Sequence, residues 1–146
     1  LYSVTGDDRW LKWLRGTGSL YWDRRHPVTG LVPGCIGDPR DQARQSGLGG
    51  TALLAYFLLQ AWELAPGEGW LRERAEALLV AAEKYSRAEA GYFERTTVEG
   101  EPATGLMTPW SVRYGQSSLL EPARIAARFA RTFPDGPYRE MALHMG

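Results

Sequence analysis

The stretch that decides the fold is residues 51–71, which read TALLAYFLLQAWELAPGEGWL. Its first half is apolar almost all the way round a helix, so we expect it to be covered on every side. A turn signal follows at residues 66–69, because one proline and two glycines there interrupt the helical pattern. Beyond Trp70 the pattern becomes amphipathic. The stretch therefore predicts two helices joined by a tight turn, the first an inner helix and the second an outer one.

The second helix of this pair is predicted to have one dry and one wet face. The apolar residues that share a face are Trp70, Leu71, Ala75, Leu78, Ala82 and Tyr85. The charged residues predicted to point away from it are Arg72, Glu73, Arg74, Glu76 and Glu83. This spacing is typical of a helix that packs on a core by one side only.

The same pattern recurs along the chain. A turn signal followed by an aromatic residue and a helix-forming run occurs at Trp10, Trp70 and Tyr138, at intervals of 60 and 68 residues. After the first of these turns, one helical face carries Trp10, Trp13, Leu14, Thr17 and Tyr21. A second apolar helix is expected over about 118–133, with Pro122 near its start. One side of this helix carries a stripe of arginines, Arg124, Arg128 and Arg131. We interpret the stripe as a solvated or ion-paired face. Repetition at this period predicts stacked helix pairs.

Long loops separate the pairs, and each contains the tripeptide Thr-Gly-Leu, at 29–31 and at 104–106. Residues 92–98 alternate in hydropathy and predict a small hairpin that closes near Gly100.

We expect an all-α fold, an α/α toroid of inner and outer helices, of which residues 1–146 form a single fragment of about a third. The repeat units are about 5–65, 66–133 and an incomplete 134–146. Bare helix faces in such a fragment predict that it associates with the rest of a parent toroid or with a self-association partner.

Composition excludes several classes of function. The 17 basic and 17 acidic residues cancel, so the chain lacks the basic surface that nucleic-acid binding needs. The longest apolar run, residues 53–61, is too short to span a bilayer, and we expect no membrane partner. Two separated histidines and one cysteine form no metal-ligand cluster, and no dinucleotide or phosphate motif is present, so no cofactor is expected. The compartment is not indicated.

The long loops hold the candidate binding residues, since they lead to the helix N-termini at one end of the repeat. Aromatic rings stack on the C–H faces of sugars, and forked guanidinium groups bind carboxylates. The predicted substrate-binding residues are Trp22, Arg44, Trp110, Arg113, Tyr114 and Gln116. The alternative for the aromatic residues is that they pack the loops against the helices.

Candidates for proton transfer are the loop residues His26, Asp38 and Asp41. Asp38 precedes a proline and is also a typical turn residue, and Asp41 could cap the next helix. His26 is one of two histidines and the one that lies in a long loop.

Residues 26–32, His-Pro-Val-Thr-Gly-Leu-Val, resemble the Asp-Pro-x-Thr-Gly-Leu-Trp loop of the unsaturated-uronide hydrolases, which are six-hairpin toroid enzymes. A Ser/Gly-rich helix start followed by alanine and aromatic residues completes the likeness at 45–57. Residues 113–116 are similar to the Gly-Gln helix starts of glucuronyl epimerases. His26 stands where that family has Asp, and Val32 where it has Trp.

The resemblance implies a carbohydrate-processing enzyme, a glycoside hydrolase or polysaccharide lyase that acts on oligo- or polysaccharides containing uronic acid. A sugar epimerase of the same fold stays open. So does a non-catalytic helical-repeat scaffold, although long loops rich in Trp, Tyr, Arg and Asp favour an enzyme.

Overall fold

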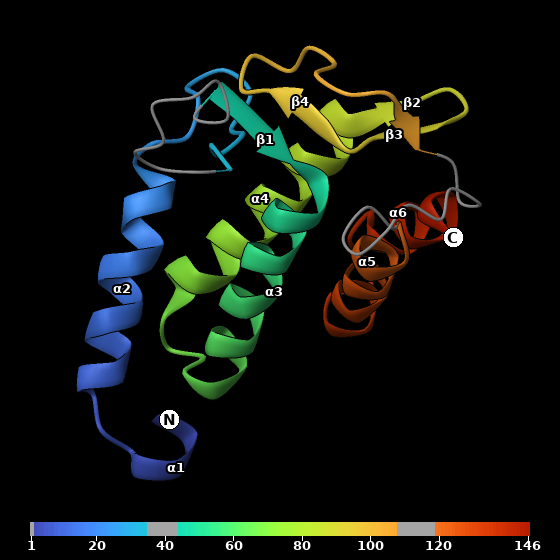
Figure 1. The fold of residues 1–146 in the computed structure, drawn as a ribbon. Helices are drawn as coiled ribbons and strands as arrows, with labels where there is room; N and C mark the ends of the chain where they lie inside the picture. Colours follow the sequence, from blue (N-terminus) through green and yellow to red (C-terminus); the bar gives the residue numbers. More distant parts are fainter. Residues whose placement is uncertain (1, 35–43, 108–118) are drawn as a thin grey trace.

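The computed structural model describes residues 2–34, 44–107 and 119–146, and it is mostly helical, as expected (Figure 1). Its helices are α1 (Tyr2–Thr5), α2 (Arg9–Trp22), α3 (Leu48–Leu64), α4 (Gly69–Ser86), α5 (Leu120–Thr132) and α6 (Tyr138–Met145). Its strands are β1 (Gln45–Gly47), β2 (Arg87–Ala88), β3 (Gly91–Phe93), β4 (Arg95–Thr97) and β5 (Leu106–Met107). None of the helices in these three ranges combines the length and apolar character needed to cross a membrane.

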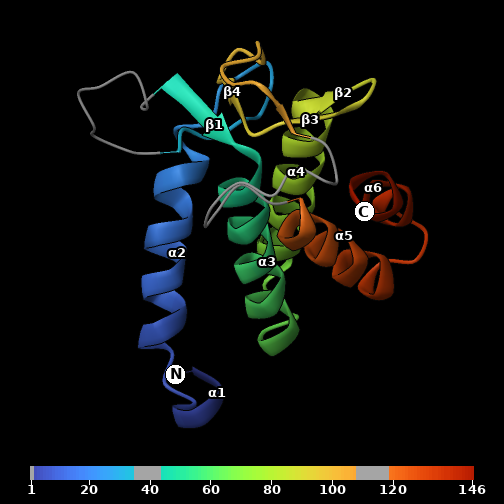
Figure 2. The ribbon, with the colours of Figure 1, turned by 45° about the vertical axis from the view of Figure 1, so that its right-hand side comes forward.

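The predicted helix pair in the middle of the chain is present as α3 and α4, which lie side by side and antiparallel (Figures 1 and 2). Helix α3 begins at Leu48, between the Ser/Gly-rich start expected at 45–47 and the apolar run that begins at Thr51. The turn between the two helices is tight, since the N–H of Glu68 donates to the carbonyl of Ala65 at 2.9 Å. Of the expected core residues of α4, four are buried, namely Leu71, Ala75, Leu78 and Ala82, whereas Trp70 and Tyr85 are partly exposed. Hydropathy at helical spacing therefore predicted this pair correctly.

The recurring aromatic residues Trp70 and Tyr138 each contact a helix of the preceding repeat unit. Trp70, at the start of α4, contacts α2, and Tyr138, at the start of α6, contacts α4. The Trp70 ring lies against Gly18 of α2, where a Cβ would be 3.7 Å from Cζ3 of Trp70. The hydroxyl of Tyr138, at the start of α6, donates to Glu76 of α4 at 2.6 Å. The recurring aromatic residue thus has a recurring structural role, which is to join successive repeat units.

Helix α5 covers one side of α3. Ile125 and Phe129 are fully buried in the core shared by the two helices. Polar contacts flank this core, because Arg128 pairs with Glu63 of α3 at 2.5 Å and Arg124 pairs with Glu121 at 2.6 Å. The ion-paired reading of the arginine stripe is confirmed at these two positions.

Two predictions of burial were wrong. Trp10 and Trp13 were placed on the dry face of their helix, but their side chains are 38% and 66% exposed. Helix α3 was expected to be covered on every side, yet Leu53 and Phe57 are 38% and 54% exposed. The reason is the same in both cases. The described helices cover α3 on the sides of α4 and α5, and none of them lies over the face between α2 and α3 (Figure 2).

Glu83 was predicted to point away from the core, and it is buried instead, with 6% exposure. It accepts a hydrogen bond from the hydroxyl of Tyr92 at 3.0 Å and pairs with Arg87 at 3.3 Å. Both partners follow α4 in the chain, where β3 folds back over the helix end and covers the carboxylate. Burial and the nearby carboxylate raise the pKa of Tyr92, so its hydroxyl remains a hydrogen-bond donor at neutral pH.

The β structure differs from the single hairpin that residues 92–98 predicted. The turn near Gly100 is present, with a φ of 100° and a bridge between Thr96 and Pro102. Strand β4, however, pairs antiparallel with β1, with Ser46 opposite Thr96. Strand β3 pairs with β2 and β5 in a separate sheet. The residues expected to start a helix at 45–47 thus form a strand, because β4 supplies a partner from the next loop.

Replacing Tyr92 by Phe tests the buried pair. The change leaves the Glu83 carboxylate without its hydroxyl donor, so we expect a loss of about 1–3 kcal/mol in the free energy of unfolding. Urea unfolding of Tyr92→Phe measures it. Tyr85→Phe is the control, because it removes a hydroxyl from a partly exposed tyrosine of α4, the helix that carries Glu83. Equal stability of the two variants would contradict this account of the pair.

Candidate functional site

The first Thr-Gly-Leu loop folds into a tight turn directly after α2. The N–H of His26 donates to the carbonyl of Leu31 at 2.8 Å, and the N–H of Gly30 donates to the carbonyl of His26 at 2.9 Å. Gly30 has a φ of 74°, which favours glycine at that position. The turn is therefore closed by its own backbone at both ends, and it places Leu31 and Val32 in the interior.

The side chain of His26 also holds this turn. Its Nδ1 lies 3.4 Å from the N–H of Thr29 and 3.3 Å from the Thr29 hydroxyl. An Asp or Asn side chain makes the same kind of contact in ordinary Asx turns, because a side-chain acceptor two or three atoms from Cα reaches the backbone N–H ahead. His26 thus has a structural function at the position where the resembling loop has Asp.

Both Thr-Gly-Leu threonines bind the segment around β4. The Thr29 hydroxyl donates to the carbonyl of Val98 at 2.6 Å. The Thr104 hydroxyl accepts from the N–H of Arg95 at 3.0 Å. The two tripeptides differ in burial, however, since Leu31 is 1% exposed and Leu106 is 40% exposed. The shared feature is the threonine, which fastens each long loop to the strand segment between them.

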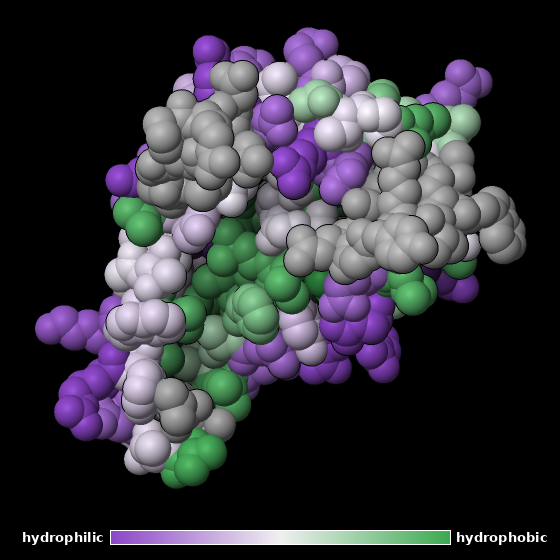
Figure 3. Space-filling view, viewed as in Figure 1, coloured by the Kyte–Doolittle hydropathy of each residue, from purple (hydrophilic) through white to green (hydrophobic). Residues whose placement is uncertain are grey.

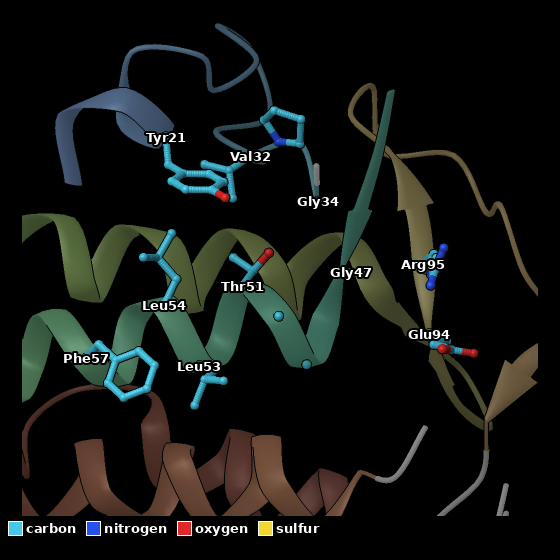
Figure 4. A pocket seen from close by; sticks show the side chains of 13 residues that line it. Tyr21, Val32, Gly34, Gly47, Thr51, Leu53, Leu54, Phe57, Glu94 and Arg95 are labelled. Atoms are coloured by element: carbon cyan, nitrogen blue, oxygen red, sulfur yellow. The ribbon is translucent and has the colours of Figure 1, made fainter. Parts of the chain in front are cut away.

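These loops and the start of α3 surround a cavity of about 460 Å³. Figure 4 shows Tyr21 and Val32 on one side, Thr51 and Leu54 of α3 on the other, and Arg95 beyond the helix start. The full lining is Tyr21, Val32, Pro33, Gly34, Gly47, Gly49, Gly50, Thr51, Leu53, Leu54, Phe57, Glu94 and Arg95. The cavity therefore has an apolar part along α3 and a polar end at the N-terminus of that helix.

The polar end is built by the way α3 begins. The N–H of Leu48 donates to the carbonyl of Glu94 at 3.0 Å, which fixes the helix start against the strand segment. Above Gly49 and Gly50 the space is open, since a Cβ on either would meet nothing within 4 Å. Within the described part of the chain, Arg95 has no ion-pair partner. A guanidinium group beside a helix N-terminus favours an anionic group in this part of the cavity.

Three of the residues predicted from the sequence lie at this end of the molecule, and each already has a protein partner. Trp22 is partly buried against the core, with the guanidinium carbons of Arg25 and Arg74 at 4.0 and 5.1 Å from the centre of its ring. His26 holds the turn, and Arg44 pairs with Glu99 at 3.3 Å. For Trp22 these contacts favour the alternative in which the ring packs the loop against the helices. The three residues do not line the cavity.

The other predicted residues lie outside the described ranges, namely Asp38, Asp41, Trp110, Arg113, Tyr114 and Gln116. Conversely, sequence reasoning did not select Tyr21, Thr51 or Arg95 as binding residues. Tyr21 could have been found as the last member of the apolar stripe of its helix, at the loop end. Arg95 could not, because only the pairing of β1 with β4 brings it to the start of α3. No group of three or more His, Cys, Asp or Glu residues that could hold a metal ion occurs in the described ranges.

Substitution of His26 tests whether its hydrogen bond to Thr29 stabilises the loop. His26→Ala removes the acceptor for the Thr29 N–H and should cost about 1 kcal/mol in the free energy of unfolding. His26→Asp supplies a carboxylate acceptor and should retain most of that stability. Urea unfolding at neutral pH measures both variants. An equal loss in the two would show that the hydrogen bond to Thr29 does not stabilise the loop.

Comparison of the chain with protein-family models, with curated proteins and with solved structures found no match. What the chain does must therefore be inferred from its own residues.

Proposed function

We propose that this chain is part of a carbohydrate-processing enzyme of the α/α toroid type, a glycoside hydrolase or polysaccharide lyase acting on uronic-acid-containing glycans. In this proposal the cavity at the start of α3 receives one sugar residue. The observation that carries it is the combination of Tyr21 with Arg95 on the walls of one cavity, beside the N-terminus of α3. A uronic acid needs both an aromatic surface and a carboxylate-binding group.

The size and the lining of the cavity support this assignment. Its volume of about 460 Å³ falls in the range of small-molecule sites, which is roughly 300–1,000 Å³. Tyr21 and Phe57 offer aromatic surface to the C–H faces of a sugar ring. Arg95 and the N–H groups of Gly49 and Gly50, where the space is open, would bind the carboxylate. The Thr51 hydroxyl, which shares a hydrogen bond of 3.3 Å with Ser46, retains capacity for a sugar hydroxyl.

The chemical step is assigned to residues of the long loops. Asp38 and Asp41 are proposed for proton transfer, together with His26, whose Nδ1 is occupied by the turn and whose Nε2 would exchange the proton. The residues proposed to bind further sugar units are Trp22, Arg44, Trp110, Arg113, Tyr114 and Gln116. A glycan that extends along the loop end would reach both long loops, since Thr29 and Thr104 fasten them to the same segment.

The reaction is tested with the purified protein, uronic-acid polysaccharides and the unsaturated oligosaccharides cut from them by a lyase. The ultraviolet absorbance of the unsaturated uronic acid rises if the protein is a lyase and falls if it is an unsaturated-uronide hydrolase. We expect one of these changes. We also expect Arg95→Gln to slow it at least tenfold, the effect of about 1.4 kcal/mol of lost carboxylate binding.

The control for Arg95 is Arg139→Gln, which removes an exposed guanidinium from α6, far from the cavity in sequence. Unchanged turnover in Arg95→Gln would exclude the cavity as the sugar site. A flat absorbance with all substrates would contradict both the lyase and the unsaturated-uronide hydrolase. An interconversion of sugar epimers, followed by chromatography, would then identify the epimerase alternative.

A further inference from the structure

An apolar groove runs between α2 and α3, below the cavity. We call this the α2–α3 groove and define it by Trp10, Leu14 and Tyr21 of α2 and by Leu54 and Phe57 of α3. The three residues of α2 follow at helical spacing and share one face. Trp10 and Phe57 are 38% and 54% exposed. Figure 3 shows the groove as a hollow lined by hydrophobic atoms, with α2 on its left.

The groove lies at the open edge of a layer of helices. Within this layer α5 covers one flank of α3, where Arg124 lies 5.3 Å from the ring centre of Tyr56 and Arg128 pairs with Glu63. Leu54 lies on the opposite flank of α3 and points toward Tyr21, whereas Phe57 lies on the exposed face between the two flanks, next to Tyr56 (Figure 4). A helix placed in the groove would therefore pack on this side of α3 as α5 packs on the other side.

The repeat shows what kind of element belongs there. An apolar helix precedes the turn before α4 and packs on α4, and α5 holds the same position before α6. Helix α2 also follows a tight turn, with Gly6 at a φ of 64° and the N–H of Trp10 donating to the carbonyl of Asp7 at 3.1 Å. The short α1 ends at the start of this turn, as α3 ends before the turn to α4. Helix α3 packs beside α4, and the equivalent place beside α2 is the groove.

The chemistry of the groove selects an apolar occupant. None of the five residues that define the groove carries a charge. A charged segment would lose its hydration there without gaining an ion pair. An extended peptide would leave backbone N–H and C=O groups unpaired against this surface, whereas a helix pairs them internally.

We propose that the α2–α3 groove is the binding site of one apolar α-helix, which lies antiparallel to α2 and is continuous at its end with α1. The helix covers Trp10 and Phe57 and forms the missing wall at the apolar end of the cavity. The polar end, at Arg95, stays open. This packing is independent of the proposed function, because it requires no ligand.

The experiment supplies such a helix in the correct register. At the repeat interval of 60 residues, Tyr2 corresponds to Trp62. A copy of residues 48–61 is therefore placed directly before Tyr2. It then continues into α1, as the first part of α3 continues into its last turn. We expect the extended chain to have a higher Tm and tryptophans several-fold less accessible to acrylamide quenching. Trp10→Phe in both chains identifies the part of the signal that comes from Trp10.

Two controls test whether the groove is the site. The same extension with every Leu and Phe replaced by Gln keeps the length but should protect nothing. Phe57→Glu in the groove, with the copy unchanged, should abolish the protection, because it places a charge against the docked helix. Unchanged quenching with the apolar extension, in a chain whose circular dichroism shows the added helix, would overturn the proposal.

A second measurement covers the case in which the extended chain does not fold. A peptide of residues 48–61 is added to the unextended chain, and protection of Trp10 is again expected, while absence of binding would count against the helix. Light scattering on the unextended chain tests the other occupant, a second copy. A dimer that Phe57→Glu dissociates would show that the groove is a self-association surface and would overturn the single-helix proposal.

Discussion

The burial of α3 is the constraint on which the rest of the structure depends. A helix that is apolar on nearly all sides cannot be covered by one neighbour, because a single packed helix shields only one stripe of it. Helix α4 covers the stripe that contains Ala55 and Leu59, and α5 covers the flank beside Tyr56. The third flank, at Leu54 and Phe57, accounts for the groove. The exposed apolar surface is thus a direct consequence of the composition of α3.

The loop end is organised by a different interaction, the hydrogen bonds from threonines to one strand segment. Thr29 and Thr104 are 75 residues apart, and each bonds to the backbone between Arg95 and Val98. Because this segment also pairs with β1, the start of α3 is fixed relative to both long loops. The cavity therefore has walls from three separate parts of the chain, which is the arrangement expected of a binding site placed on loops over a helical scaffold.

The sequence predicted what depends on local periodicity and missed what depends on distant pairing. The helix pair α3–α4, the turn near Gly100 and the buried face of α4 follow from spacing alone. The burial of Glu83 does not, because it requires Tyr92 to return over the helix end. Nor does the strand at 45–47, which exists only because β4 pairs with it. For the site, the sequence pointed to the long loops, but none of the three described candidates, Trp22, His26 and Arg44, lines the cavity. Arg95 was missed, since its position depends on that same pairing.

The groove and the cavity are two parts of one apolar surface, and this relation links fold to function. Tyr21, Leu54 and Phe57 line the cavity and also flank the groove. An aromatic surface open along its whole length would hold a sugar ring weakly, because water competes for the polar groups at its end. Closing the apolar part with a helix would leave Arg95 and the start of α3 as the polar part of an otherwise dry pocket, where electrostatic contacts are stronger. The helix would dock without a ligand, but the same three side chains would then form the apolar wall for the proposed sugar, so its binding would depend on the docked helix.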